Sequence, residues 1–168
     1  RPGETGIRTR RVAILVANGV DGAQVKKIYS SLLADGAVPR LVSSKLGKVA
    51  SSDGGFLDVE ITLEDGPCVL YDAVIVPDGA DAAAVLARDA HAQDFMRDQY
   101  RHCKPILVIG DGATLLKASN VPDTLPDGSA DPALIVAQGA DVTAAVDAFK
   151  AALAGHRSFA RETDPPLV

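Results

Sequence analysis

The sequence is poor in aromatic side chains, with no Trp, three Tyr and four Phe among its 168 residues. Haem pockets, base-stacking platforms and sugar-binding clefts normally draw on more flat side chains than this. The composition therefore argues against such sites in this chain. Cysteine is also scarce: Cys68 and Cys103 form no CxxC motif, and two cysteines make no disulfide framework. We expect both to be small buried hydrophobic residues.

Long apolar runs and an excess of positive charge are missing as well. No run approaches the roughly 20 residues of a membrane span, and residues 1–6 lack the apolar region of a signal peptide. The 17 basic and 22 acidic residues give a net charge of −5, which argues against nucleic acid or a membrane as a partner. These features predict a cytoplasmic protein. Because the chain begins without Met, we also expect it to be an excised or separately expressed domain.

Apolar runs of strand length alternate with segments of helical spacing along most of the chain. The predicted strands cover residues 12–17, 38–44, 73–77, 106–109 and 133–137. The predicted helices cover residues 25–33, 80–86, 90–102, 113–118 and 141–154. Between the second and third strands, residues 48–51 and 56–61 flank a Gly-rich turn and predict a small β-hairpin.

This alternation predicts an α/β fold, with a three-layer, doubly wound and mostly parallel sheet and a β-hairpin insertion. We expect one domain over residues 11–156, preceded by a linker over residues 1–10 and followed by a polar C-terminal tail over residues 157–168.

Ligands of doubly wound sheets bind beyond the carboxyl ends of the strands, which here are residues 18–21, 77–79 and 110–112. Gly110-Asp111-Gly112 lies where a strand meets a helix, the position of a nucleophile elbow. An Asp nucleophile needs an activated substrate or a metal. We therefore expect Asp111 to cap the following helix instead.

Other candidate motifs lack the spacing that their chemistry needs. Leu115 replaces the third glycine of a dinucleotide-binding loop. No EF-hand spacing occurs among the clustered acids, so we expect solvated turn residues at Asp78, Asp81, Asp89, Asp123, Asp127 and Asp131. No metal or triad spacing occurs among the histidines, so we expect solvated or helix-end positions for His91, His102 and His156. The sequence predicts no metal site and no cofactor-binding residues.

Residues 71–79 and 104–110 resemble the class I glutamine-amidotransferase-like group, which has a flavodoxin-like fold and includes intracellular proteases and related chaperones. Active members carry Cys followed by His at the elbow and an acidic residue after the first strand. The resemblance places Asp111 and Gly112 at the Cys and His positions and Asp21 at the acidic position. It implies a degenerate elbow at Gly110, Asp111 and Gly112, a vestigial Asp21, and no catalytic residue.

Residues 11–22, 100–106 and 161–166 resemble, more specifically, the C-terminal domain of large-subunit haem catalases. The resemblance implies a parent enzyme that converts hydrogen peroxide to water and oxygen with a haem in a core domain absent from this chain. The expected partners are that core and the other subunits of a homotetramer, with a role in assembly stability and substrate access. Two alternatives stay open: a holding chaperone for unfolded client proteins, and a residual hydrolase that uses Asp21 and Asp111.

Overall fold

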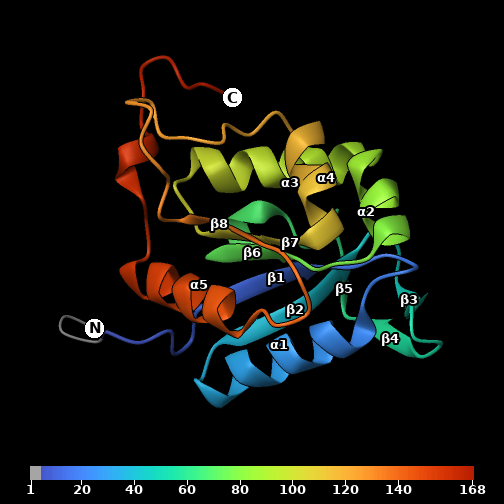
Figure 1. Cartoon of the computed structure of the whole chain (residues 1–168). Coiled ribbons are helices and arrows are strands. Elements are labelled where there is room, and N and C mark those ends of the chain that lie inside the picture. The colour runs from blue at the N-terminus through green and yellow to red at the C-terminus, as the bar shows by residue number, and fades with distance from the viewer. Residues whose placement is uncertain (1–4) are drawn as a thin grey trace.

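A six-stranded parallel sheet forms the centre of the molecule (Figure 1). The computed structural model describes residues 5–168, so residues 1–4 of the predicted linker 1–10 lie outside the described residues. Every pairing in this sheet is parallel, in the order β5-β2-β1-β6-β7-β8. The strands are β1 (Arg11–Leu15), β2 (Val38–Ser43), β5 (Ile61–Thr62), β6 (Ala73–Val76), β7 (Ile106–Ile109) and β8 (Leu134–Ala137).

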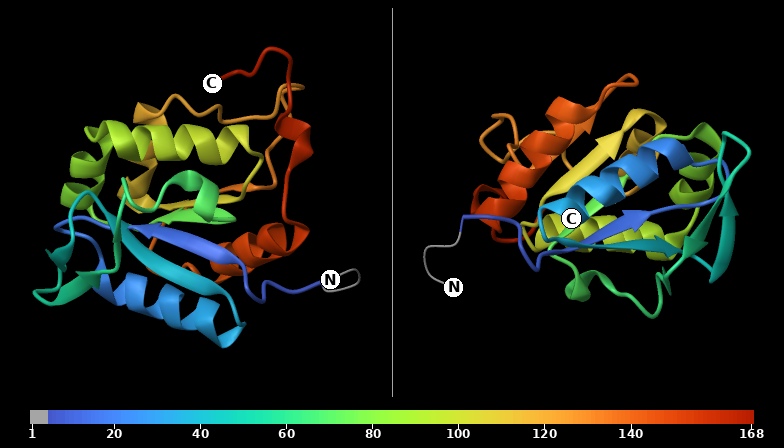
Figure 2. Two further views of the ribbon diagram at one scale, coloured as in Figure 1. Left: turned by 180° about the vertical axis from the view of Figure 1, so that it is seen from behind. Right: turned by 90° about the horizontal axis from the view of Figure 1, so that it is seen from below.

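Helices cover both faces of the sheet (Figures 1 and 2). One face carries α1 (Gly22–Ala34) and α5 (Thr143–Gly155). The other carries α2 (Ala80–Ala87), α3 (Ala90–Arg101) and α4 (Ala113–Ala118). The 3₁₀ turns are η1 (Cys68–Leu70), η2 (Gly110–Gly112) and η3 (Phe159–Arg161). All residues of β6 and β7 are buried, as expected of parallel strands covered on both faces. The predicted doubly wound α/β fold is confirmed.

The first strand and helix form for the local reasons that their sequence indicates. In α1 the buried side chains of Val25, Ile28 and Leu32 recur every three or four residues and face the sheet. The Asp21 carboxylate caps the helix by accepting a hydrogen bond from Gln24 N at 2.9 Å. Gly36 follows the helix with a φ of 78°, a conformation that glycine adopts without steric cost. No helix of the described residues combines the length and the apolar character that crossing a membrane requires.

The predicted hairpin is present, but its second arm is shorter than expected. β3 (Gly47–Ala50) and β4 (Phe56–Val59) pair antiparallel. Ile61 was expected at the end of the second arm. It instead forms a separate edge strand with Thr62, and this strand pairs in parallel with β2. Glu60 lies where the chain changes sheets, and it binds β2 there: its backbone N–H donates to the Leu41 carbonyl, and its carboxylate accepts from Leu41 N at 2.8 Å.

The C-terminal segment expected as a polar tail packs against the domain. Ser158 N donates to the Cys103 carbonyl at 2.7 Å. The buried Arg161 guanidinium donates to the Asp131 carboxylate at 2.5 Å and to the Lys104 carbonyl at 2.7 Å. Asp131 is therefore not a solvated turn residue, as the sequence suggested, because an arginine 30 positions away buries and neutralises it. The boundaries of the linker and the tail stay predictions.

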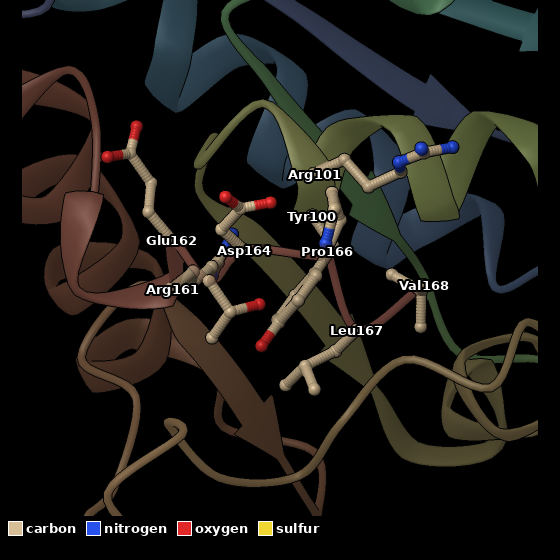
Figure 3. Close-up of a pocket in the computed structure, with 9 residues that line it drawn as sticks. Tyr100, Arg101, Arg161, Glu162, Asp164, Pro166, Leu167 and Val168 are labelled. Carbon is tan, nitrogen blue, oxygen red and sulfur yellow. The ribbon is translucent and has the colours of Figure 1, made fainter.

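Figure 3 shows the hollow that this segment encloses with the end of α3. Its volume is about 500 Å³, and the Tyr100 ring lies under the Arg161 guanidinium, 4.7 Å from its central carbon. Tyr100 and Arg161 are both almost fully buried. The packed contact between Tyr100 and Arg161 therefore forms part of the wall of this hollow.

Candidate functional site

The loops that follow β1, β6 and β7 meet at the carboxyl edge of the sheet, where the fold predicts a ligand site. Asp21 N donates to the Asp78 carbonyl at 2.9 Å, and Asp78 N donates to Oε1 of the nearly buried Gln24 at 2.9 Å. These two bonds hold the loop after β6 against the start of α1. The Asp21 carboxylate is already used to cap α1, so Asp21 supports the loop and does not face a thiol.

The turn after β7 has the shape of an elbow, and its strained position is Gly110. Gly110 has a φ of 53° and directly follows the strand. A nucleophile elbow places its reactive residue at such a sharp strand-to-helix turn, so the structure favours Gly110 for that position over Asp111, one residue later. A Cβ at Gly112 would lie 2.6 Å from the Val76 carbonyl oxygen, so glycine is needed there too.

Asp78 fills the space that a side chain at the elbow would use. A Cβ on Gly110 would overlap the Asp78 carboxyl group. Oδ1 of Asp78 accepts hydrogen bonds from Gly79 N at 2.8 Å and from Asp111 N at 2.9 Å. The Asp78 side chain therefore links the loop after β6 to the turn after β7, and Asp78 is not the solvated turn residue that the sequence predicted. The sequence offered one signal for this role, because Asp78 follows the end of a buried parallel strand.

The predicted helix cap at Asp111 is wrong. The residue at the cap of α4 is Gly112, and no side chain caps that helix. The turn η2 separates β7 from α4, which leaves the Asp111 side chain exposed one residue before the cap. Next to the elbow lies an open polar hollow of about 310 Å³. Its lining residues are Asp78, Gly110, Asp111, Ala113, Thr114, Lys117 and Gln138.

The other reactive side chains lie away from the elbow. Cys68 and Cys103 are buried, as expected, and burial raises the pKa of both thiols. The ring of His91 approaches Glu64 at the surface, while His102 and His156 end α3 and α5. The solvated or helix-end positions predicted for the histidines are confirmed. Among residues 5–168, no three His, Cys, Asp or Glu side chains group in a way that could hold a metal ion.

Sequence reasoning missed a buried polar cluster at the opposite end of the sheet. Lys104 Nζ donates to the Cys68 carbonyl at 2.8 Å, and Gln99 Nε2 donates to the same carbonyl at 3.3 Å. Lys104 is 3% exposed, and burial lowers the pKa of its ammonium. The cluster ties η1 to α3 and to the start of β7. No periodicity or motif could have indicated it, because its members are 31 and 36 positions apart.

The fold places the chain in a class of α/β proteins with known structures. It is similar to a two-domain protein from Anabaena variabilis that contains DJ-1/ThiJ/PfpI-like and ferritin-like domains. The TM-score is 0.70 at 16% identity, and the similarity covers 77% of this chain and 44% of that one. The chain therefore has the DJ-1/ThiJ/PfpI-like fold, in agreement with the predicted flavodoxin-like, class I glutamine-amidotransferase-like architecture. An identity this low shows the fold alone.

Within that class, the sequence identifies a particular family. Residues 8–163 match the model of the C-terminal domain found in long catalases. The chain is 36% identical over 161 residues to catalase HPII of Pseudomonas putida, covering 96% of this chain and 21% of that one. It is 32% identical over 165 residues to catalase HPII of Mycobacterium avium, covering 94% and 23%. The chain belongs to the family of C-terminal domains of long catalases, and it spans about a fifth of the length of these curated relatives.

Proposed function

We propose that this chain is a non-catalytic accessory domain of a long catalase. The match of residues 8–163 to the C-terminal domain of long catalases carries the proposal. In it, the parent enzyme converts hydrogen peroxide to water and oxygen on a haem held by its core domain. The accessory domain contacts that core and the other subunits of a homotetramer, stabilises the assembly and shapes the access of substrate.

The candidate site supports a role without chemistry of its own. Gly110, the residue with a positive φ in the elbow turn, carries no side chain, and Asp78 occupies the neighbouring space. The three tyrosine side chains contact other side chains of the domain, and these contacts do not suit an axial ligand of a haem. Tyr71 packs against Phe95 with ring centroids 5.8 Å apart, Tyr100 lies under Arg161, and the Tyr29 hydroxyl donates to Glu60 at 3.2 Å.

Two measurements on the purified 168-residue chain test the catalytic half of the proposal. With added haem we expect no Soret band of a specific complex, and with hydrogen peroxide we expect no evolution of oxygen above that of buffer. Reproducible turnover of peroxide by the chain alone would overturn the proposal.

The structural half is tested in a long catalase that carries this domain. Deleting the part that corresponds to residues 11–163 is expected to lower the temperature at which the tetramer dissociates, with the turnover per haem retained. Size-exclusion chromatography during heating and oxygen evolution report the two quantities. A truncated enzyme whose tetramer is as heat-stable as the full one, with an unchanged KM for peroxide, would contradict the assembly and access roles.

A holding chaperone is the second candidate, and the hairpin supplies the observation that favours it. Leu46 directly precedes β3, and Phe56 begins β4 next to the turn; their side chains are 64% and 62% exposed. Large exposed apolar side chains of this kind could each contact an unfolded client protein. In this role, an equimolar amount of the chain would suppress light scattering by a heated client protein, and Phe56→Ser would weaken the suppression. Scattering unchanged by the chain would exclude the role.

A further inference from the structure

Two backbone amides at the elbow point at one oxygen atom. The N–H groups of Gly79 and Asp111 come from the loops after the neighbouring strands β6 and β7. Both donate to Oδ1 of Asp78, at 2.8 and 2.9 Å. Amides that converge in this way, fixed by the fold before any ligand arrives, bind a negatively charged oxygen strongly.

The position of these amides is that of an oxyanion hole. In elbow enzymes, the hole consists of the N–H of the residue after the nucleophile and a second N–H from a neighbouring loop. Gly110 holds the strained elbow position, so Asp111 is the residue after it and Gly79 supplies the second amide. The chain therefore presents two donors at this place, and Gly110 beside them offers no nucleophile side chain.

The backbone of Asp78 is fixed by hydrogen bonds on both sides of its side chain, and this keeps the carboxylate near the two amides. Asp78 N donates to Gln24 Oε1 and the Asp78 carbonyl accepts from Asp21 N, each at 2.9 Å. Because both backbone groups are fixed, the short Asp side chain has little freedom to leave the two amides. The absence of a Cβ at Gly110 leaves the room that the carboxylate fills.

We propose that the elbow is a binding site for a carboxylate-type anion and that its occupant is the chain's own Asp78 side chain. The Asp78 side chain occupies both amide donors of the elbow, so no oxygen of a substrate can reach them while Asp78 is in place. Removing the Asp78 carboxylate opens the site to a small external carboxylate. This inference is independent of the proposed role in a catalase, since it concerns only the elbow of this chain.

Asp78→Ala tests the proposal with formate as the probe. In ¹H–¹⁵N NMR spectra we expect the substitution to move the amide resonances of Gly79 and Asp111. Sodium formate, titrated against sodium chloride at constant ionic strength, is expected to move them back in a saturable way. The wild-type resonances are expected to stay fixed, because the site is filled. Asp78→Asn is the matched control: it keeps an acceptor oxygen in place, so its response to formate is expected to be at least five-fold smaller.

The proposal is wrong if formate leaves both resonances of Asp78→Ala unmoved, or moves them equally in the wild type. A second variant covers the case in which Asp78→Ala does not fold. Gly110→Ala places a Cβ into the carboxylate, so we expect the Gly79 and Asp111 resonances to shift as the carboxylate is displaced. Gly128→Ala is its control, because Gly128 also has a positive φ of 84° but has open space around its Cβ position. Gly110→Ala spectra that leave both amides in place would refute the assignment.

Discussion

The ion pair between Asp131 and Arg161 predicts a large loss of stability when either partner is removed. Both side chains are 1% exposed, and Nε of Arg161 lies 2.5 Å from Oδ2 of Asp131. In Arg161→Ala, the Asp131 carboxylate keeps only the Ala133 N–H at 2.8 Å, and the Lys104 carbonyl loses its guanidinium donor. Breaking a buried pair from one side costs about 3–5 kcal/mol. At about 2–4 °C per kcal/mol for a domain of this size, the melting temperature should fall by about 6–20 °C.

Urea unfolding followed by circular dichroism measures this loss, since the chain has no Trp to report by fluorescence. Asp131→Asn keeps the side-chain volume and removes the charge, and it should also destabilise strongly. Asp94→Asn is the matched control: Asp94 pairs with Arg97 at the same 2.5 Å, but its side chain is 68% exposed, and exposed pairs contribute about 0–1 kcal/mol. Equal losses for Asp131→Asn and Asp94→Asn, or a loss under about 1 kcal/mol for Arg161→Ala, would refute the reasoning.

Three further predictions concern other parts of the domain. Gly79→Ala should lower the free energy of unfolding by at least about 2 kcal/mol in urea titrations, because Gly79 has a φ of 131° and a Cβ there would lie 2.8 Å from Val20 Cα; a smaller loss would show that the loop can relax. Burial and the nearby Arg10 and Arg157 lower the pKa of His156 below 6.5, so the unfolded chain binds the proton more tightly. Wild-type stability relative to His156→Asn should therefore rise as the pH increases through the folded pKa and level off above about 6.5; a flat difference would contradict the shift. Cys68 and Cys103 should react with a thiol reagent at neutral pH only after unfolding, since burial raises both pKa values; rapid modification of the native protein would disprove this.

The sequence was sufficient to predict the central sheet because its strands carry continuous apolar runs. A run such as Ile106–Ile109 is buried on both faces and needs no partner information to be recognised. The same reasoning located the carboxyl edge of the sheet and the elbow there. The edge strand Ile61–Thr62 was missed because two residues form no pattern, and its pairing depends on the Glu60 contact with Leu41.

The roles of individual acids could not be predicted in the same way. Asp78 and Asp131 stand in loops with many other acids, and their composition gives no sign of burial. What distinguishes them is a partner that lies far along the chain: the amide of Asp111 for one, and the guanidinium of Arg161 for the other. Local patterns report on neighbours within a few residues, so contacts over 30 or more positions appear only in the folded structure.

The contact of Arg161 also bears on when the domain can fold during synthesis. Arg161 supplies the counter-charge of Asp131 and a donor to the Lys104 carbonyl, and it follows both β7 and β8 in the chain. Until Arg161 has left the ribosome, the nascent chain would have to bury Asp131 as an unpaired carboxylate, which is strongly unfavourable. The β7–β8 side of the sheet is therefore expected to complete its packing only after Arg161 has emerged, rather than strand by strand as β7 and β8 emerge.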